Sequence, residues 1–421
     1  MVSITAGAAG MYCGSCLRDN ALATELQALG DWEVTLLPLY TPIRTDEPDV
    51  SVDQVFFGGI NVYLQQKVPL FRHLPRFLDR WLDNPRLIRR VASRAMSVNA
   101  KDLGEMTLSM VRGEHGFQAK EVRRLIDFLR KQKPDLICLT NLLVGGCIPA
   151  LKKELPDVPV LVTLQGDDLF LDELEEPWRS SVLEEMKNLA SAADGFITFS
   201  GFYRDVVADL FEIPYEKFHL TALGADLEGF TGDRDSGGNT IGYFARICPE
   251  KGFDLLVSAF LELAKRDEFA DTKLQFGGWL AEKNREFFEN EMGRIEKAGL
   301  SDRVLHVGSP DRDGKLEFFR ATDVFCVPAR FVEPKGMYAI EAMAAGIPVV
   351  APDHGAFPEM IAASGGGCLF PAGDVEALAG CLAETLKNPG DLGRNGRAWA
   401  ISKADRATMA RSTAAVFEKF V

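Results

Sequence analysis

The sequence contains no long uninterrupted apolar segment. No such run reaches the roughly 18 residues that a membrane-spanning helix needs. The nearest candidate, residues 136–151, is broken by Asn141, Gly145, Gly146 and Pro149, so we expect a strand, a loop and a helix there. The start of the chain has neither a basic region nor a long apolar core, and we expect no signal peptide.

Cysteine is present without the pattern of a disulfide framework. The 8 cysteines are scattered through predicted strands and helices, as in reduced proteins of the cytoplasm, where we expect this chain to reside. Cys13 and Cys16 have the spacing of a redox or metal pair. No second pair or histidine cluster completes a zinc set, which favours packing or loop shaping and leaves a redox role open.

An excess of positive charge is also lacking. The chain has 47 Lys and Arg against 61 Asp and Glu, a net charge of -14. This balance argues against nonspecific binding of nucleic acid by the whole molecule, although a local basic patch could still attract anions. With 421 residues and 47% hydrophobic content, the chain is long and apolar enough for two or three domains with substantial cores.

Apolar strand-like segments alternate with helical patterns along the whole chain. This alternation predicts an α/β fold with parallel sheets covered by helices. The glycine-rich polar segment 231–240 separates two such halves and is expected to be a linker. The predicted strands are 34–39, 136–140, 160–164, 196–200 and 219–222 in the first half, and 240–245, 274–276, 304–307, 324–327, 348–351 and 368–370 in the second.

Two acidic residues, Glu333 and Glu341, stand before an apolar run with seven residues between them. Pro334 and Gly336 should keep Glu333 in a loop, whereas 337–345 lacks a breaker and predicts a short helix. The start of a helix binds anions through its free N–H groups, and Glu341 points back toward them. Because carboxylates accept hydrogen bonds from sugar hydroxyls, the segment has the features of a nucleotide-sugar site. The alternative is a solvated acidic face.

Two cations, Arg246 and Lys251, follow the predicted strand 240–245. Arg offers a planar fork to phosphate oxygens and Lys a mobile point charge, so the pair suits a leaving diphosphate. Alone, both residues would equally fit surface charges at a helix start. The apolar run after Glu341 favours a site, because a carboxylate beside buried structure needs a partner.

In combination, these motifs resemble the donor-domain signature of retaining glycosyltransferases of the GT-B fold, family 4, with some starch- and glycogen-synthase-like character. The resemblance rests on the cation pair, the glutamate pair and the segment 355–359, which occur in the family's order, and it covers nearly the whole chain. It implies two Rossmann-like, doubly wound domains that face a cleft. The acceptor would bind to residues 1–235 and the donor to residues 236–403, with a C-terminal helix, 404–421, packed back on the first domain.

The resemblance also implies roles for residues of the donor site. Glu333 would hold hydroxyls of the donor sugar, Glu341 the ribose, and Arg246 with Lys251 the diphosphate. The residues expected to add backbone N–H groups are Gly336, Met337 and Tyr338. No cofactor or metal is required, because cations and a helix end would stabilise the leaving diphosphate.

The amino-terminal loop 7–16 joins a short strand to a predicted helix at 17–29. Its small residues let the backbone approach a ligand. In the resembled family such a loop faces the donor phosphates, which makes Gly10 and Met11 candidate donor-binding residues. The spacing is not that of a dinucleotide-binding motif.

Acceptor recognition is expected in the first domain, where polar residues end two predicted strands. The candidates for contact with acceptor or sugar are Asn141, Gln165, Asp167 and Asp168. Many family members carry a histidine where this chain has Gln165. Because Gln cannot take a proton near neutral pH, a histidine-based role is in doubt. The Asp-x-Asp pairs 233–235 and 311–313 fit turns better than metal sites.

The segment 68–94 combines seven arginines with interleaved aromatic and aliphatic residues. A basic amphipathic helix can lie on an anionic membrane surface, which would suit a lipid-linked acceptor and a peripheral position at the inner membrane face. The alternative is a solvated helix over the acceptor cleft.

The sequence therefore predicts a retaining hexosyltransferase of carbohydrate biosynthesis. It would move a hexosyl unit from a nucleotide-diphosphate sugar to a hydroxyl of a glycan, lipid-linked or small-molecule acceptor. Two alternatives remain, a nucleotide-sugar epimerase on the same fold and a non-catalytic nucleotide-sugar-binding protein. The sequence leaves the base, the sugar, the acceptor and the oligomeric state open.

Overall fold

The structure is a computed structural model that describes all residues except 8–13, 44, 46–47, 75–99 and 234–237. The chain forms two compact units. Unit 1 comprises Met1–Ala222 with Met409–Val421, and unit 2 comprises Leu223–Thr408. The predicted boundary between residues 235 and 236 lies outside the described residues. Within the described ranges, no helix is both long and apolar enough to cross a membrane.

Unit 1 contains a six-stranded parallel sheet with the order β2-β1-β3-β4-β5-β6. Its strands coincide with the segments predicted from the sequence, because short apolar runs between turns favour fully buried parallel strands. The strands are β1 (Val2–Thr5), β2 (Thr35–Pro38), β3 (Ile137–Leu139), β4 (Val160–Thr163), β5 (Gly195–Thr198) and β6 (Phe218–Leu220).

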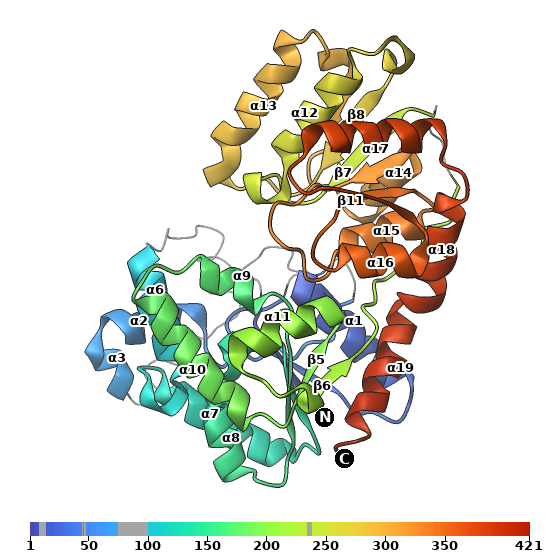
Figure 1. Ribbon diagram of the computed structural model, residues 1–421. Helices are drawn as coiled ribbons and strands as arrows, with labels where there is room; N and C mark the ends of the chain where they lie inside the picture. The colour runs from blue at the N-terminus through green and yellow to red at the C-terminus, as the bar shows by residue number, and fades with distance from the viewer. Residues whose placement is uncertain (8–13, 44, 46–47, 75–99, 234–237) are drawn as a thin grey trace. The chain divides into compact units, whose positions relative to one another are not determined.

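Helices cover both faces of this sheet (Figure 1). Alternate strand residues point to opposite faces, so Ile137 and Leu139 join one buried cluster and Cys138 joins the other. The second cluster contains α1 together with the carboxyl-terminal α19. The helices are α1 (Gly14–Ala28), α2 (Gly59–Lys67), α3 (Pro69–His73), α6 (Ala100–Val111), α7 (Ala119–Gln132), α8 (Ile148–Glu154), α9 (Asp167–Asp172), α10 (Trp178–Ala192), α11 (Gly201–Phe211) and α19 (Arg406–Phe417).

Unit 2 contains a second six-stranded parallel sheet, with the order β12-β11-β10-β7-β8-β9. The α/β fold predicted for both halves is confirmed. The strands are β7 (Thr240–Phe244), β8 (Lys273–Gly277), β9 (Val304–His306), β10 (Val324–Cys326), β11 (Val349–Pro352) and β12 (Gly367–Phe370).

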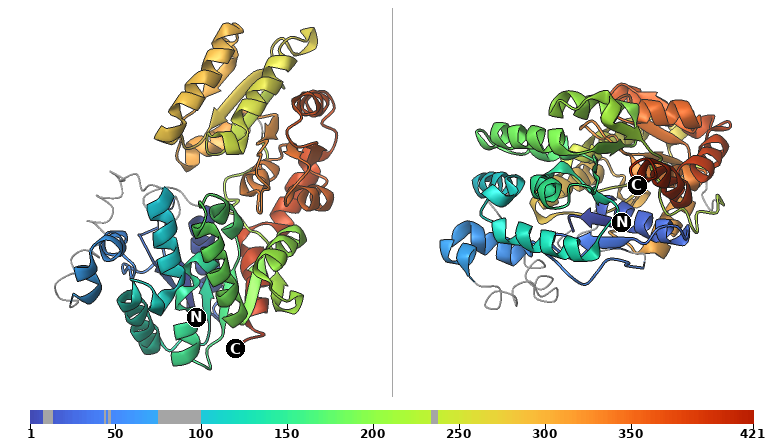
Figure 2. Two further views of the ribbon diagram at one scale, coloured as in Figure 1. Left: turned by 60° about the vertical axis from the view of Figure 1, so that its left-hand side comes forward. Right: turned by 90° about the horizontal axis from the view of Figure 1, so that it is seen from below.

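Helices also lie on both faces of the second sheet (Figure 2). On β7, Tyr243 packs edge-on against Phe253 of α12, whereas the next residue, Phe244, packs against Phe318 of α14. Because successive strand residues face opposite ways, α12 and α14 lie on opposite faces. The helices are α12 (Phe253–Leu263), α13 (Arg285–Lys297), α14 (Arg312–Arg320), α15 (Met337–Ala344), α16 (Phe357–Ser364), α17 (Val375–Lys387) and α18 (Leu392–Lys403).

Each sheet has one point where the strand order reverses. In unit 2, the chain runs from β7 outward to β8 and β9, then returns to the other side of β7 and continues from β10. In unit 1 the corresponding reversal lies between β1 and β3. Ligands of open α/β sheets bind outside the carboxyl ends of the strands at such switch points. The loops after β7 and β10, and after β1 and β3, are therefore where a site is expected.

Candidate functional site

Glu333 lies in the loop that follows β10, directly before α15. Gly336 adopts the left-handed conformation that glycine favours (φ 70°), and α15 begins at the next residue. The loop is held by its backbone: the Ala356 N–H donates to the Glu333 carbonyl at 2.9 Å. The motif segment 355–359 therefore fixes the position of Glu333 through the main chain.

The Glu333 carboxylate forms a buried ion pair with Lys251. The Lys251 Nζ lies 2.6 Å from Glu333 Oε2, and the two side chains are only 10% and 8% exposed. The Tyr338 hydroxyl donates to the same oxygen at 3.1 Å. The Lys251 ammonium also lies over the rings of Phe331 and Tyr338, at 4.4 and 4.8 Å from their centroids. The predicted cation and the predicted acid thus meet directly at the switch point of unit 2.

Electrostatics keep the Glu333 carboxylate ionised. Burial acts to raise the pKa of Glu333, but Lys251 and the Gly336 N–H outweigh it and hold that pKa below its ordinary value. Burial and the neighbouring Glu333 charge raise the pKa of Tyr338 well above its ordinary value. Tyr338 therefore remains a hydrogen-bond donor at neutral pH.

Lys251 reaches Glu333 because two loops approach each other closely. The β7 strand ends at Phe244, and a one-turn helix at Pro249–Lys251 leads into α12. Gly252 (φ 69°) lies between this one-turn helix and α12, and a Cβ atom at Gly252 would lie 1.9 Å from the Pro328 carbonyl oxygen. Only glycine permits this contact between the loops after β7 and β10.

Arg246 comes from the same loop as Lys251 but has a different environment. Its side chain is exposed, and its backbone carbonyl accepts a hydrogen bond from the Tyr243 hydroxyl at 2.7 Å. Among the residues described, the guanidinium makes no hydrogen bond or ion pair. The structure does not join Arg246 to Glu333, and its predicted contact with a diphosphate stays a prediction.

Glu341 lies one turn into α15, and its carboxylate forms an ion pair with Lys315 of α14. Both side chains are largely buried. Lys315 was not predicted from the sequence, because it belongs to no motif and stands 26 residues upstream of Glu341. Met337 and Tyr338 form the first turn of α15, as predicted. Gly336 differs from the prediction in one respect, since its N–H already stabilises the Glu333 carboxylate.

Comparison with known proteins assigns unit 2 to a family. Residues 229–399 match the family model described as glycosyl transferases group 1. Unit 2 is a group 1 glycosyl transferase domain. The match includes the Lys251–Glu333 pair, the Lys315–Glu341 pair and the segment 355–359.

Curated proteins similar to this chain include two mannosyltransferases. The lipopolysaccharide core biosynthesis mannosyltransferase of Rhizobium meliloti is 32% identical over 197 residues, 43% of this chain and 52% of the relative. The MMP alpha-(1->4)-mannosyltransferase of Mycolicibacterium hassiacum is 30% identical over 248 residues, 57% of each chain. The chain spans about half the length of the curated relatives it matches.

Solved structures confirm the GT-B fold of this chain. Sucrose-phosphate synthase from Thermosynechococcus elongatus has a TM-score of 0.70 at 19% identity, covering 99% of this chain and 98% of the other. Anabaena HepE in complex with UDP has a TM-score of 0.68 at 18% identity, covering 99% of both chains. At these identities the likeness establishes the fold alone.

The Asp-x-Asp segment 311–313 begins a helix of the glycosyl transferase domain. Asp311 is the N-cap of α14, and its carboxylate accepts from the Gly314 N–H at 3.1 Å. The part of the chain that the structure describes holds no group of three or more His, Cys, Asp or Glu placed to bind a metal ion. The prediction that no metal takes part stays a prediction.

The predicted acceptor residues of unit 1 gather at the carboxyl ends of β3 and β4, where they hold loops. Asn141 Oδ1 accepts from the Val144 N–H at 3.0 Å. The Asp167 carboxylate accepts from the Leu142 N–H at 2.7 Å and from the Gln165 N–H at 3.2 Å.

The two remaining candidates are also engaged by their own unit. The Gln165 amide donates to Thr140 Oγ1 at 2.9 Å, and Asp168 accepts from the Tyr203 hydroxyl at 2.7 Å. An acceptor role of these side chains stays a prediction. Gly10 and Met11 lie outside the described residues, as does most of the segment 68–94 on which the predicted membrane contact rests.

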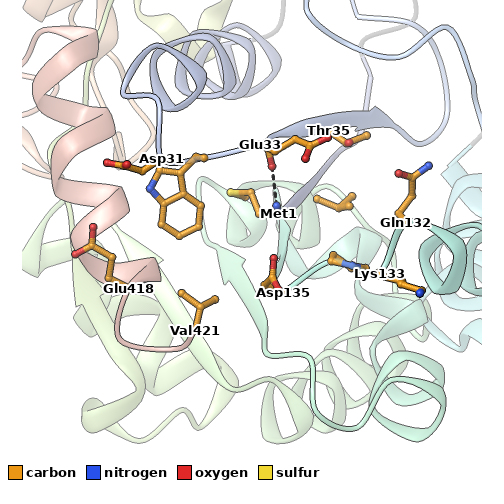
Figure 3. Close-up of a pocket in the computed structure, with 12 residues that line it drawn as sticks. Met1, Asp31, Glu33, Thr35, Gln132, Lys133, Asp135, Glu418 and Val421 are labelled. Atoms are coloured by element: carbon orange, nitrogen blue, oxygen red, sulfur yellow. Dashed lines mark hydrogen bonds between the residues drawn. The ribbon is translucent and has the colours of Figure 1, made fainter.

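A separate cavity of about 480 Å³ lies at the amino ends of strands β1, β2 and β3 of unit 1, opposite to the carboxyl ends at which the switch point lies (Figure 3). Its lining includes Glu33 and Asp135, next to the starts of β2 and β3, and the side chains of Trp32 and Glu418. Ligands of open α/β sheets gather at carboxyl ends. We therefore place the functional site at the switch points and not in this cavity.

Asp167 predicts a pH dependence of stability in unit 1. Burial raises the pKa of Asp167 to about 7, against about 3.9 in an unfolded chain. A raised pKa means that the folded state holds the proton more tightly, so this stabilisation is full below pH 4 and is lost as the pH approaches 7. Between pH 5 and 8 we expect the wild type to lose roughly 2–3 kcal/mol relative to Asp167→Asn.

The measurement is denaturant unfolding of both proteins at pH 5 and at pH 8. Asn keeps an oxygen that accepts from the Leu142 N–H but does not titrate, so the difference between the two proteins isolates Asp167. Equal pH slopes for the wild type and Asp167→Asn would show that Asp167 does not titrate in this range.

Proposed function

We propose that this chain is a retaining glycosyltransferase that moves a hexosyl unit from a nucleoside diphosphate sugar to an acceptor hydroxyl. The observation that carries the proposal is the buried Lys251–Glu333 pair at the switch point of a group 1 glycosyl transferase domain. A buried ion pair is seldom a net source of stability. Because the pair lies at the carboxyl ends of β7 and β10, where ligands of such sheets bind, we infer that its role is in function and not in stability.

In the proposed complex, Lys251 neutralises charge on the diphosphate as the bond to the sugar breaks. Its ammonium carries three donors, so it can bind a phosphate oxygen while it keeps Glu333. The first turn of α15 adds unpaired N–H groups and the positive end of its dipole. Arg246, exposed on the same loop, supplies a second cation.

Glu333 is proposed to bind hydroxyls of the donor sugar through Oε1. Lys251 and Tyr338 engage Oε2, whereas the contact from the Lys335 N–H to Oε1 is long, at 3.4 Å. That oxygen therefore has accepting capacity for a ligand. Glu341 is proposed to bind the ribose, with Lys315 holding its carboxylate in place.

The reaction then needs little proton transfer by the protein. The acceptor hydroxyl attacks the anomeric carbon from the face that the diphosphate leaves, and the departing phosphate oxygen takes the hydroxyl proton. The C–O bond to the acceptor forms as the C–O bond to the diphosphate breaks, and configuration is retained because both bonds lie on the same face of the anomeric carbon. The names of the relatives, which include mannosyltransferases and D-inositol 3-phosphate glycosyltransferases, support a hexosyl donor.

A thermal-shift screen tests the donor site. UDP, GDP, ADP and their hexose conjugates are added to the wild type, to Glu341→Gln and to Arg246→Ala. A ligand at 100 times its dissociation constant stabilises the native state by about 2.7 kcal/mol, so one nucleotide series should raise the melting temperature of the wild type by several degrees. Both variants should lose most of that shift.

The matched control is Arg394→Ala, which removes an exposed arginine of α18 in the same unit. It should keep the full shift. If no nucleotide moves the melting temperature of the wild type at millimolar concentration, the proposed donor site is wrong.

A further inference from the structure

An apolar cavity of about 280 Å³ lies at the switch point of unit 1. It opens at the carboxyl ends of three strands, because Ala6, Tyr40 and Asn141 follow β1, β2 and β3 and line it. Most of the remaining lining is apolar and comes from α2, α6 and α9, whose places Figure 1 shows. The apolar side chains from these helices are Val62, Leu103, Met106, Met110 and Phe170, and the turn Leu142–Cys147 adds Leu143 and Val144.

Two polar groups in this cavity lack a partner within the described chain. Asn141 uses its Oδ1 to cap the turn at Val144, which leaves its Nδ2 as a donor. The Tyr40 hydroxyl makes no hydrogen bond; its ring packs edge-on against Phe57, with centroids 6.2 Å apart. Ligand sites are typically apolar clefts with a small number of placed polar groups, and this cavity has that composition.

We propose that this cavity binds the acceptor, and that the acceptor is an alcohol with an apolar body whose hydroxyl lies at Asn141 and Tyr40. The inference rests on the proposed function, which requires an acceptor hydroxyl, and it selects the apolar class among the acceptors that the sequence leaves open. A bare sugar would leave its hydroxyls unpaired against the apolar wall, which costs free energy.

The shape of the lining supports an aliphatic or irregular apolar group. Met106 and Met110 stand four residues apart on α6 and share one helix face. Methionine is unbranched and flexible, so its side chain adapts to ligands of varying shape. A volume of about 280 Å³ is near the lower end of the range for small-molecule sites, about 300–1,000 Å³. The cavity therefore takes the hydroxyl end and the first part of an apolar chain.

Isothermal titration calorimetry with 1-butanol, 1-hexanol and 1-octanol tests the cavity without any donor. Each methylene that enters it should raise affinity by about fourfold, until the cavity is full. Met106→Gln and Leu143→Gln should reduce this gain to less than twofold per methylene. Gln keeps the helix propensity and length of Met, so Met106→Gln should fold normally.

Two further variants test the hydroxyl contacts. Tyr40→Phe removes only the phenolic oxygen. Asn141→Asp keeps the capping oxygen for Val144 but removes the Nδ2 donor, and Asp is a strong N-cap. Each should weaken 1-hexanol binding about fivefold or more while the melting temperature stays near that of the wild type.

The matched control is Leu220→Gln, on β6, because Leu220 is 51% exposed and lies outside the cavity. It should bind all three alcohols like the wild type. Equal affinities for butanol and octanol, or a chain-length gain that survives in Met106→Gln and Leu143→Gln, would overturn the inference. A melting temperature that rises with protein concentration, without alcohol binding, would mean that a second copy covers the cavity and would also overturn it.

The nucleotide screen separates this inference from the proposed function. Nucleotide binding without discrimination among the alcohols leaves the donor site standing and overturns the apolar acceptor site. Discrimination among the alcohols without nucleotide binding supports the cavity as a site for apolar alcohols and overturns the transferase.

Discussion

The Lys251→Met variant is expected to unfold with a free energy about 3–5 kcal/mol below that of the wild type. Met keeps the length of the side chain but removes the charge, so the Glu333 carboxylate stays buried without its cation. The wild-type pair has an Nζ–Oε2 distance of 2.6 Å and side chains that are 10% and 8% exposed, so water can replace little of the lost interaction. Guanidinium unfolding followed by circular dichroism measures the difference.

A double variant separates the structural from the catalytic role of this pair. Lys251→Met with Glu333→Gln buries no unpaired charge, so we expect it to regain at least about 2 kcal/mol of the loss. Transfer activity should stay at least about a hundredfold below that of the wild type, because both groups proposed to act on the donor are gone. Equal free energies of unfolding for the single and double variants would show that burying the Glu333 carboxylate without Lys251 does not destabilise the protein.

The pH dependence and an exposed pair provide controls. Without Lys251, burial favours the protonated form of Glu333. Protonation relieves the penalty, so the deficit of Lys251→Met should be smaller at pH 5 than at pH 8. The exposed pair Arg285–Glu282 has side chains 56% and 81% exposed, and Arg285→Met should change stability by less than about 1 kcal/mol.

The fold could be predicted because it depends on short-range patterns. A fully buried parallel strand needs a short apolar run between turn residues, and the strands of both units coincide with the runs that the sequence contains. The strand order required the structure. The sequence does not show that β7 lies between β10 and β8, and it is this order that brings Lys251 to Glu333.

The candidate site was predictable where a motif marks the chain and unpredictable where a contact depends on helix placement. Lys251 was identified as one of two cations after a predicted strand, and Glu333 as one of two acids before an apolar run. Lys315 lies on an ordinary charged helix, and its contact with Glu341 arises only from the packing of α14 near α15. Sequence alone could not distinguish Lys315 from the solvated lysines of the chain.

The acceptor candidates show a different limit. Asn141 follows β3 at the switch point of unit 1, and Gln165 and Asp167 follow the neighbouring β4, where ligand-binding side chains gather at the carboxyl ends of strands. The same position contains backbone N–H groups that need acceptors, and the Asn141 and Asp167 side chains supply them. The sequence locates polar residues there but does not show how many of their atoms remain for a ligand. In the structure, the Asn141 Oδ1 is used by the Val144 N–H, and the Asn141 Nδ2 remains as a donor for a ligand.

The Gly355→Ala variant is expected to lose transfer activity by about a hundredfold. Gly355 has φ 67°, and a Cβ atom there would lie 2.5 Å from the Glu333 carbonyl oxygen and 2.8 Å from its nitrogen. Both are backbone atoms, so the loop that holds Glu333 must shift, and its carboxylate must shift with it. A misplacement of about 1 Å in a catalytic group can cost about a hundredfold in rate. The measurement is turnover with the donor that the thermal-shift screen identifies.

Gly373→Ala is the matched control, because it separates the backbone cost from the displacement of Glu333. Gly373 also has a positive φ, 80°, but a Cβ atom there meets no heavy atom within 4 Å. Alanine should cost about 1–2 kcal/mol at either position, from the left-handed conformation alone. Only Gly355→Ala should add further destabilisation and lose activity, because only Gly355 packs against the backbone of Glu333. Wild-type turnover in Gly355→Ala would show that the position of Glu333 does not limit the reaction.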